Sequence, residues 1–333
     1  MKAAQIINYS KTIKAQVNEV PVPDIQDHEV LIKVKAAAIN PLEMLIMTGS
    51  VKLIQDYAFP LTIGNELAGV VEKVGKQVHG FSVGDDVYGR LPIEKIGAIA
   101  EYAAVDAAAL AIMPKNVSYE EAAGVALTGL TAYQGLHEEL NVRSGKTVFI
   151  PGGSGSFGQM AVPIAKTLGL KVIVSGNAES RERTMQLGAD QYLDYATQNY
   201  EDLLTNVDYV IDTLGPSEFK KELSILKQGG RLLSLRTGPN KRFAQDRKFP
   251  FWKQILFSLA GAGYDRAAKK QGVEYRFIFV RSDGGQLKEI TSIVEANQIV
   301  PALHPKRFTI AEINEALELV ATGRPKGKVI ITF

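Results

Sequence analysis

The chain has 333 residues, of which 46% are hydrophobic, and its formal net charge is only +2. This length is enough for two domains with separate cores, and no basic stripe with aromatic residues suggests a nucleic-acid partner. The lack of cysteine excludes disulfides, thiolate chemistry and cysteine-ligated zinc. No apolar stretch reaches the ~20 residues that span a bilayer, and the first residues indicate a strand rather than a signal peptide. We therefore expect a cytoplasmic protein with no membrane partner.

The first 110 residues are rich in β-branched runs separated by turn glycines. Val30 to Val34, Gly69 to Val74 and Gly84 to Tyr88 are the clearest of these runs. Short strands with frequent turns are typical of a barrel or sandwich rather than of alternating strands and helices. The N-terminal part therefore predicts a β-rich, barrel-like domain.

A glycine-rich turn follows an apolar strand in the middle of the chain. Residues 147 to 158 read T-V-F-I-P-G-G-S-G-S-F-G, and the segment from Gln159 to Leu168 is amphipathic. Gly153, Gly155 and Gly158 fit the G-x-G-x-x-G pattern. In this pattern the first two glycines permit a tight turn close to a pyrophosphate, the third permits close packing of helix and strand, and the helix N-terminus binds phosphate. An ordinary glycine turn is the alternative, and the position between strand and helix favours the dinucleotide site.

Strands and helices alternate after this motif, which predicts a parallel sheet covered on both faces. The expected strands are Lys171 to Ser175, Gln191 to Leu193, Asp208 to Asp212 and Arg231 to Leu235, and the expected helices are Ala178 to Leu187 and Ser217 to Leu226. Ligands bind at the carboxyl ends of such strands. Those ends fall at Gly152, Ser175, Thr213 and Arg236.

The end of the second strand indicates which dinucleotide binds. A site for NAD usually has an acidic residue there, roughly 20 residues beyond the first glycine. This chain instead has Ser175, Gly176 and Asn177, with Arg181 one helical turn later. Hydroxyl, amide and guanidinium groups suit a 2′-phosphate, so we expect NADP(H). The alternative is that Arg181 is a solvated residue among other charged residues of its helix.

Two further segments lie in the C-terminal third of the chain. Residues 239 to 272 form an aromatic-rich insertion that contains Phe251, Trp252, Phe257 and Tyr264. The strand from Lys328 to Phe333 follows an amphipathic helix, and we expect this strand to pair with the N-terminal domain because a lone strand needs a partner.

Several stretches in order resemble the medium-chain dehydrogenase/reductase superfamily, and within it the zinc-free quinone oxidoreductases and enone or alkenal reductases. They are residues 60 to 89, with their spaced glycines, and residues 129 to 133, 189 to 195, 212 to 215 and 327 to 330. The resemblance implies an α/β fold with a Rossmann-type doubly wound parallel sheet and a β-rich GroES-like barrel domain. It places the barrel domain at residues 1–121 and 285–333, and the dinucleotide-binding domain at residues 122–284.

Zinc-dependent members of this superfamily have a cysteine and a histidine where this chain has Asn40 and Asn65. Asparagine is a poor zinc ligand beside thiolate or imidazole. The four histidines, His28, His79, His137 and His304, match no ligand spacing. We therefore expect no catalytic metal.

The resemblance also implies a reaction. NADPH would deliver hydride to a quinone or to the C=C bond of an α,β-unsaturated carbonyl, and both acceptors need a hydrogen-bond donor near an oxygen that gains charge. Asn40 and Tyr57 are the catalytic candidates. The alternative for Asn40 is an Asn-Pro turn residue, and the alternative for Tyr57 is an amphipathic wall residue. Glu43 differs from the acid most often seen in this segment and is interpreted as structural.

The remaining implications concern binding and assembly. The residues expected to contact the cofactor are Asn40, Thr128, Thr131, Gly152, Gly153, Gly155, Ser156, Phe157, Gly158, Ser175, Asn177, Arg181, Tyr195, Leu214, Ile278, Phe279, Val280 and Lys328. The insertion would form a wall of the pocket for a small apolar carbonyl or quinone, or would be an amphipathic helix buried against its own domain or a partner subunit. The strand from Tyr275 to Arg281 resembles the edge strand through which related enzymes form homodimers. Two other functions stay open: a reductase of quinones alone, and an NADPH-binding sensor or structural protein with little turnover.

Overall fold

The computed structural model describes residues 1–323 and 325–333. They form two compact units, which are described separately. Unit 1 comprises Met1–Leu130 and Arg281–Phe333, and unit 2 comprises Thr131–Val280. The first division falls inside the helix α2 (Tyr119–Gln134), so this helix contributes residues to both units. The sequence placed the two divisions after residues 121 and 284.

Unit 1 is built mainly of strands, as the β-branched runs predicted. Its strands are β1 (Lys2–Ile6), β2 (Gln16–Glu19), β3 (Glu29–Ile39), β4 (Leu61–Thr62), β5 (Glu66–Val74), β6 (Asp86–Arg90), β7 (Tyr102–Asp106), β8 (Leu110–Ile112), β15 (Phe308–Thr309) and β16 (Val329–Thr332). Its helices are α1 (Pro41–Met47), α9 (Gly284–Ala296) and α10 (Ile313–Thr322), with short 3-10 turns η1 (Ala107–Ala109) and η4 (Ile310–Glu312). This is the expected GroES-like architecture.

The long strand β3 organises the larger sheet of unit 1. The sheet has the order β15-β16-β3-β5-β6-β8, with β7 also paired to β3, while β2, β1 and β4 form a smaller sheet. Two register shifts along β3 and β5 bend the strands, which helps the sheet to curve around an apolar core. That core includes Ile32, Leu67, Val87 and Ile331, all of them buried.

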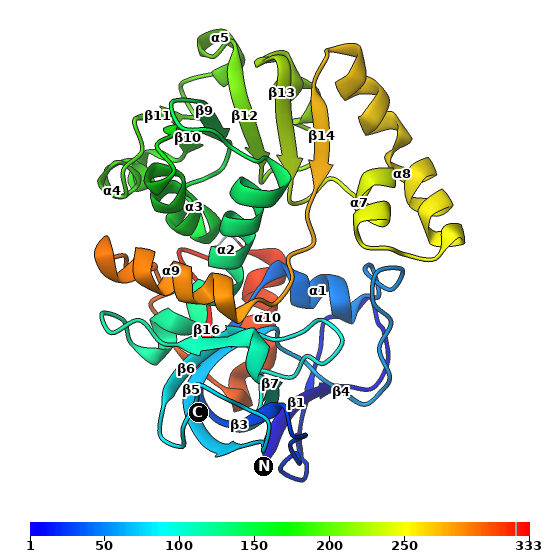
Figure 1. Ribbon diagram of the computed structural model, residues 1–333, viewed down its shortest axis with the longest axis vertical. Helices are drawn as coiled ribbons and strands as arrows, with labels where there is room; N and C mark the ends of the chain where they lie inside the picture. The colour runs from blue at the N-terminus through cyan, green and yellow to red at the C-terminus, as the bar shows by residue number, and fades with distance from the viewer. Residues whose placement is uncertain (324) are drawn as a thin grey trace. The chain divides into compact units, whose positions relative to one another are not determined.

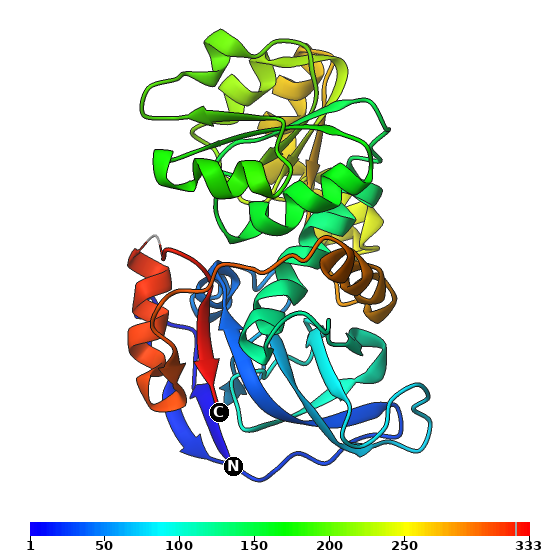
Figure 2. The ribbon, with the colours of Figure 1, turned by 90° about the vertical axis from the view of Figure 1, so that its left-hand side faces the viewer.

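The strand β16 pairs antiparallel with β3, and this confirms that the closing strand returns to the N-terminal domain. Figure 2 shows β16 and α10, both in red tones, beside the blue strands of unit 1. Val329 lies opposite Ile39 in the register. Lys328 is the residue before Val329, and Asn40 is the residue after Ile39, so the antiparallel register brings Lys328 and Asn40 together. No local sequence pattern reveals this contact.

Unit 2 contains a parallel sheet in the order β11-β10-β9-β12-β13-β14 (Figure 1). Its strands are β9 (Thr147–Ile150), β10 (Lys171–Gly176), β11 (Gln191–Asp194), β12 (Val207–Asp212), β13 (Leu226–Ser234) and β14 (Glu274–Phe277). The order of these strands in the chain is 3-2-1-4-5-6 across the sheet, which is the Rossmann order with its switch point between β9 and β12. The predicted doubly wound sheet is confirmed.

Helices connect these strands. They are the π-helical turn η2 (Gly135–Glu139), α3 (Ser156–Thr167), η3 (Ala178–Ser180), α4 (Arg181–Gln186), α5 (Tyr200–Leu203), α6 (Phe219–Ser224), α7 (Lys241–Asp246) and α8 (Phe251–Lys270). None of the helices in the described ranges is both long and apolar enough to cross a membrane.

The strand β14 is shorter than the sequence predicted. It ends at Phe277 because its partner β13 ends at Ser234, which lies opposite Phe277 in the register. Ile278, Phe279 and Val280 therefore follow the strand as a buried irregular segment. The free side of β14 is an edge of the sheet in the described part of the chain.

The insertion forms the 20-residue helix α8, which runs along β14 in Figure 1. Phe257 is buried and its ring packs against Phe243 and Phe249. Tyr264 packs its ring against Phe219 and Tyr275. These two aromatic side chains therefore pack within their own unit. This agrees with the alternative in which the insertion is buried against its own domain. The exposed apolar stripe of α8 consists of Phe251, Trp252, Ile255, Leu256 and Leu259.

Candidate active site

The glycine turn after β9 has the geometry of a phosphate-binding loop. Gly152 has a φ of 64°, in the left-handed region that favours glycine, and its amide donates to the Ser175 hydroxyl at 3.2 Å. Gly155 is the N-cap of α3. Ser156, Phe157 and Gly158 form the first turn of that helix, whose free amides and dipole suit an anion.

Two of the three glycines of the motif, Gly155 and Gly158, differ in the space that a side chain would meet. A Cβ on Gly158 would lie 1.6 Å from the carbonyl oxygen of Gly153, so this position needs glycine for helix and strand to pack. A Cβ on Gly155 would meet no protein atom nearer than 4.0 Å. Gly155 therefore borders open space beside the helix N-terminus, and the turn fits the pyrophosphate of a dinucleotide.

The end of β10 brings the predicted ribose-side residues together. Ser175 is buried and holds the glycine turn through Gly152, while Asn177, the N-cap of η3, and Arg181, the first residue of α4, are exposed. The Asn177 side-chain oxygen accepts a hydrogen bond from the Ser180 amide at 2.9 Å. This cap fixes the start of the helical segment that carries Arg181.

Tyr192 is a residue of this region that sequence reasoning missed. Its hydroxyl donates to the carbonyl oxygen of Asn177 at 2.6 Å. A Cβ on Gly176 would lie 2.1 Å from that hydroxyl and 2.4 Å from the Ser154 hydroxyl oxygen. Tyr192 and Ser154 thus fill the space that a side chain at Gly176 would need, and they pack against the loop between β10 and η3. Tyr192 belongs to a stretch that the resemblance had singled out, but its contact depends on the parallel pairing of β10 with β11.

The other predicted cofactor residues of unit 2 lie at the same edge of the sheet or near it. Leu214 follows β12 and is 41% exposed, and Tyr195 follows β11 and is 61% exposed. The Asp212 carboxylate accepts hydrogen bonds from the amides of Leu214 and Gly215, both at 2.7 Å. Asp212 therefore fixes the loop that presents Leu214, a role that the sequence did not assign.

Thr128 and Thr131 both lie on α2 and are buried. The Thr128 hydroxyl donates to the carbonyl oxygen of Gly124 at 3.0 Å, as a helix-interior threonine does when its side chain bonds to its own backbone. Ile278, Phe279 and Val280 are also buried, and Arg247 donates to the carbonyl oxygen of Phe279. The structure thus anchors this segment through its backbone.

Unit 1 holds a buried polar cluster around Asn40. The Asn40 side-chain nitrogen donates to Glu66 Oε1 at 2.8 Å, and Lys328 Nζ donates to Asn40 Oδ1 at 2.5 Å. Lys328 Nζ also lies 2.6 Å from Glu66 Oε1. Each of the three residues is 5% exposed or less. The oxygen and the nitrogen of the Asn40 carboxamide are therefore each hydrogen-bonded to a charged group. Asn40 and Lys328, which were predicted as two separate cofactor contacts, touch each other.

Glu66 connects this cluster to α2. Its second carboxylate oxygen, Oε2, accepts a hydrogen bond from the Leu127 amide at 2.6 Å. The buried ion pair of Glu66 and Lys328 thus has hydrogen bonds in addition to its charge attraction, which a buried pair needs to offset desolvation. The sequence alone gave no role to Glu66.

Glu43 and Asn65 form a second buried pair beside the first. Glu43 Oε2 accepts from the Asn40 amide at 2.6 Å, and Glu43 Oε1 accepts from the side-chain nitrogen of Asn65 at 2.7 Å. Burial raises the pKa of the Glu43 carboxyl to about 7, against the hydrogen bonds from Asn65 and Asn40, which lower it. These contacts make Glu43 a structural residue of this cluster.

The two asparagines that the resemblance compares with zinc ligands both have protein partners. Asn40 binds Glu66 and Lys328, and Asn65 binds Glu43. In the described ranges, no group of three or more histidine, cysteine, aspartate or glutamate side chains is placed to hold a metal ion.

Tyr57 has a hydroxyl group without a protein partner. The residue is 8% exposed, and its hydroxyl oxygen is fully buried and makes no hydrogen bond. Its backbone amide donates to the Tyr9 hydroxyl at 2.8 Å and to Asp56 Oδ1 at 3.0 Å, which fixes the loop. Burial holds the pKa of Tyr57 above its ordinary value, so the hydroxyl keeps its proton. An unpaired buried donor is costly unless a ligand binds it.

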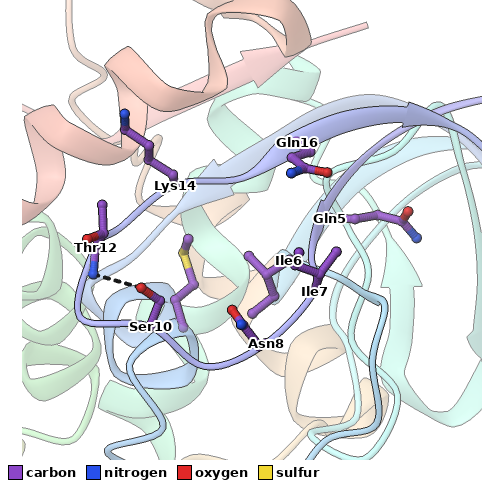
Figure 3. A pocket seen from close by; sticks show the side chains of 9 residues that line it. Gln5, Ile6, Ile7, Asn8, Ser10, Thr12, Lys14 and Gln16 are labelled. Carbon is purple, nitrogen blue, oxygen red and sulfur yellow. Dashed lines mark hydrogen bonds between the residues drawn. The ribbon is translucent and has the colours of Figure 1, made fainter.

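A separate hollow of about 170 Å³ lies at the end of β1 (Figure 3). Its lining includes Asn8, Ser10, Thr12, Lys14 and Met47, and the Thr12 amide donates to the Ser10 hydroxyl at 3.0 Å. Ligand pockets usually have ~300 Å³ or more. The hollow contains none of the predicted site residues and is not assigned a role.

Comparisons with known proteins agree with this architecture. Residues 26–115 match the alcohol dehydrogenase GroES-like domain, and residues 187–331 match the zinc-binding dehydrogenase family. The 2-methylene-furan-3-one reductase of Solanum lycopersicum is 34% identical over 99% of this chain and 79% of its own length. The chain belongs to the medium-chain dehydrogenase/reductase superfamily. The solved structure of an alcohol dehydrogenase superfamily protein from Novosphingobium aromaticivorans has the same fold, with a TM-score of 0.84, 27% identity and full coverage of both chains.

Two further relatives place the chain within the superfamily. The NADPH-dependent alkenal/one oxidoreductase of Arabidopsis thaliana is 31% identical over 94% of this chain and 74% of its own length. The quinone oxidoreductase of Homo sapiens is 31% identical over 70% of this chain and 72% of its own length. This superfamily member is therefore an oxidoreductase of the quinone and enone branch, and its cofactor is a pyridine nucleotide.

Proposed function

We propose that this enzyme is an NADPH-dependent, metal-independent reductase of α,β-unsaturated carbonyls or quinones. The observation that carries the proposal is the Asn40 carboxamide. It stands where zinc-dependent relatives have a metal ligand, and Lys328 and Glu66 hold it in place. The names of the relatives described above support both acceptor classes.

Hydride transfer to an enone or quinone requires that the cofactor and the acceptor are bound and that a hydrogen-bond donor lies at the acceptor oxygen. When bound, a reduced nicotinamide supplies hydride, and an enone or quinone that accepts it gains negative charge on oxygen. A donor held at that oxygen stabilises the charge. We assign this role to the Asn40 side-chain amide and to the Tyr57 hydroxyl, whose proton is retained at neutral pH and has no protein acceptor.

The residues of unit 2 fit the cofactor. We propose that the amides of Gly155 to Gly158 bind the pyrophosphate, beside the open space at Gly155. Ser175, Asn177 and Arg181 would bind the 2′-phosphate of NADPH, because Arg181 is an exposed cation on a segment that Asn177 caps. The remaining predicted contacts, including Tyr195, Leu214, Thr131 and the segment 278–280, would surround the nucleoside and nicotinamide.

Two more properties belong to the proposal. We propose a homodimer that forms through the free edge of β14, with the exposed apolar stripe of α8 buried beside it. An exposed strand edge and an apolar patch on a monomer are both commonly covered by a partner. Sedimentation analysis of the wild type and of Leu259→Lys would test the dimer. The expected result is a dimer in the wild type and a monomer in the variant.

We also propose a cytoplasmic location, which cell fractionation would test.

The decisive experiment is the oxidation of NADPH in metal-free buffer with a quinone, an alkenal, a cyclic enone and a saturated aldehyde. Turnover with the unsaturated acceptors and none with the saturated aldehyde is the expected result. Turnover with the quinone alone would restrict the function to quinones. Tight binding of NADPH with no turnover of any acceptor would contradict the reductase and favour a sensor.

A further inference from the structure

We propose that Lys328 and Glu66 are positioning residues that lock the Asn40 carboxamide in one orientation and leave one amide hydrogen for a carbonyl oxygen of the bound ligand. The inference rests on the proposed function, because it explains how a side chain at the position of a metal ligand acts as a hydrogen-bond donor. It also assigns to Lys328 a role other than direct contact with the cofactor.

The orientation of the carboxamide follows from the charges of its two partners. Lys328 Nζ is a donor without acceptor capacity, so the Asn40 atom at 2.5 Å from it must be the oxygen. The Glu66 carboxylate only accepts, so the Asn40 atom at 2.8 Å from it must be the nitrogen. A flip of the carboxamide would turn its NH₂ toward the ammonium and its oxygen toward the carboxylate. Both contacts would then be repulsive, so only one orientation is stable.

The locked orientation determines what Asn40 can offer a ligand. The side-chain nitrogen of asparagine carries two hydrogens, and Glu66 accepts one of them. The backbone amide of Asn40 is bound by Glu43 Oε2 at 2.6 Å. The second side-chain hydrogen is the donor that remains, and it suits a carbonyl oxygen rather than a ligand amine.

The fold explains why these residues meet. Asn40 follows the last residue of β3, Glu66 begins β5, and Lys328 directly precedes β16. Because β5 and β16 are both paired to β3, the same end of the sheet carries all three side chains. The Lys328 side chain is 4% exposed and the Glu66 side chain is 0% exposed, so the pair acts on Asn40 from the interior.

Two ligand carbonyls share the required chemistry: the carbonyl of the substrate and the carboxamide carbonyl of the nicotinamide. They are distinguished by binding measurements with NADP⁺ and with 2′-phospho-ADP-ribose, which lacks the nicotinamide. If Asn40→Asp weakens NADP⁺ binding but not binding of the fragment, the nicotinamide is the acceptor. If it weakens neither and lowers kcat/KM for the acceptor, the substrate carbonyl is the acceptor.

The positioning role is tested with Lys328→Met, Lys328→Arg and the isosteric Glu66→Gln. Lys328→Met and Glu66→Gln should each lower kcat or the affinity for NADP⁺ by about tenfold or more, and Lys328→Arg should restore most of the loss because arginine keeps the donor. Lys73→Met and Glu72→Gln remove exposed charges of the same strand β5 and serve as matched controls with wild-type values. Equal values for Glu66→Gln and Glu72→Gln in a folded protein would overturn the proposal.

One readout does not depend on turnover. In wild-type protein, the side-chain amide of Asn40 should exchange its hydrogens much more slowly than that of the exposed Asn177, as measured by NMR, and Lys328→Met should abolish the protection. Rapid exchange at Asn40 in the wild type would overturn the inference even if the enzyme is an active reductase. Slow exchange without turnover of any acceptor would instead contradict only the proposed function.

Discussion

The side chain of Asn65 donates a 2.7 Å hydrogen bond to the carboxylate of Glu43, and its backbone amide donates a second to the same oxygen at 3.1 Å. Both residues are almost fully buried. The Glu43 carboxylate is therefore held by N–H donors from Asn40 and Asn65. The charge of Glu43 stays unpaired by any cation in the contacts described, which makes the pair sensitive to pH.

The first prediction is that stability falls as pH rises because of Glu43. Its pKa is about 7 in the folded protein against an ordinary value of 4.5, so the folded state binds the proton more tightly between these values. The stabilising contribution is complete below pH 4.5 and is lost as pH rises through 7. The loss should approach about 3 kcal/mol above pH 7.

Urea denaturation at pH 5 and pH 8 measures this effect. Glu43→Gln should make the difference in unfolding free energy between the two pH values smaller than in the wild type. Glu72→Gln, at an exposed position of β5, should leave the difference unchanged. An unchanged difference in Glu43→Gln would show that Glu43 titrates near its ordinary value.

The second prediction separates binding from folding at the glycine turn. Gly158→Ala should destabilise the protein by at least about 3 kcal/mol, because its Cβ would overlap the carbonyl oxygen of Gly153. Gly155→Ala should leave the melting temperature unchanged, since its Cβ enters open space, and should raise the Kd for the nucleotide at least tenfold. Thermal unfolding and nucleotide titration of both variants check the contrast, and tight nucleotide binding by Gly155→Ala would remove the pyrophosphate from this turn.

The third prediction concerns the choice of nucleotide. Arg181→Ala should raise the Kd for NADPH by about tenfold to a hundredfold, the usual effect of losing a charge-assisted hydrogen bond, and should leave the Kd for NADH unchanged. Arg266→Ala removes an exposed arginine of α8 and is the matched control. Fluorescence titration with both nucleotides measures the ratio, and equal effects of Arg181→Ala on both would rule out contact with a 2′-phosphate.

The fourth prediction tests the two faces of α8. Phe257→Ala should lower the unfolding free energy by about 3 to 5 kcal/mol, since the ring is buried among aromatic side chains. At a low protein concentration, where the protein is monomeric, Leu259→Ala should change it by less than about 0.5 kcal/mol, because Leu259 is 71% exposed in the single chain. Guanidinium denaturation compares them, and a large loss in Leu259→Ala measured at low protein concentration would mean that the stripe is covered within the monomer.

Much of the fold could be predicted because its signals are local. The glycine turn, the alternation of strands and helices and the β-branched runs each follow from short-range patterns, and they identified the sheet of unit 2 from β9 to β13. The end of β14 was predicted too late because it depends on where β13 ends, which is a property of pairing. The helix α8 was predicted only as one of two alternatives, beside a pocket wall, because its two faces differ in burial rather than in composition.

The candidate site was predicted only in part, because some of its residues are neighbours in the sequence and others meet only through strand pairing. Residues of the phosphate turn are neighbours in the sequence, so one motif names them. Asn40 and Lys328 are 288 residues apart, and Asn40 and Glu66 are 26 apart. Only the register of β16 and β5 on β3 brings them together. Tyr192 and Asp212 escaped assignment because the contacts by which they fix their loops are to backbone groups, which the sequence does not distinguish.

The pairing of β16 with β3 also has a consequence for biosynthesis. A ribosome makes residues 131–280 well before residues 329–332, so the parallel sheet of unit 2 can form while the sheet of unit 1 still lacks a strand between β3 and β15. Lys328 reaches Asn40 only when this strand docks. The sheet of unit 2 can therefore form on the ribosome before the polar cluster of unit 1 is complete, because Asn40 and Glu66 lack their ammonium partner until Lys328 has been made.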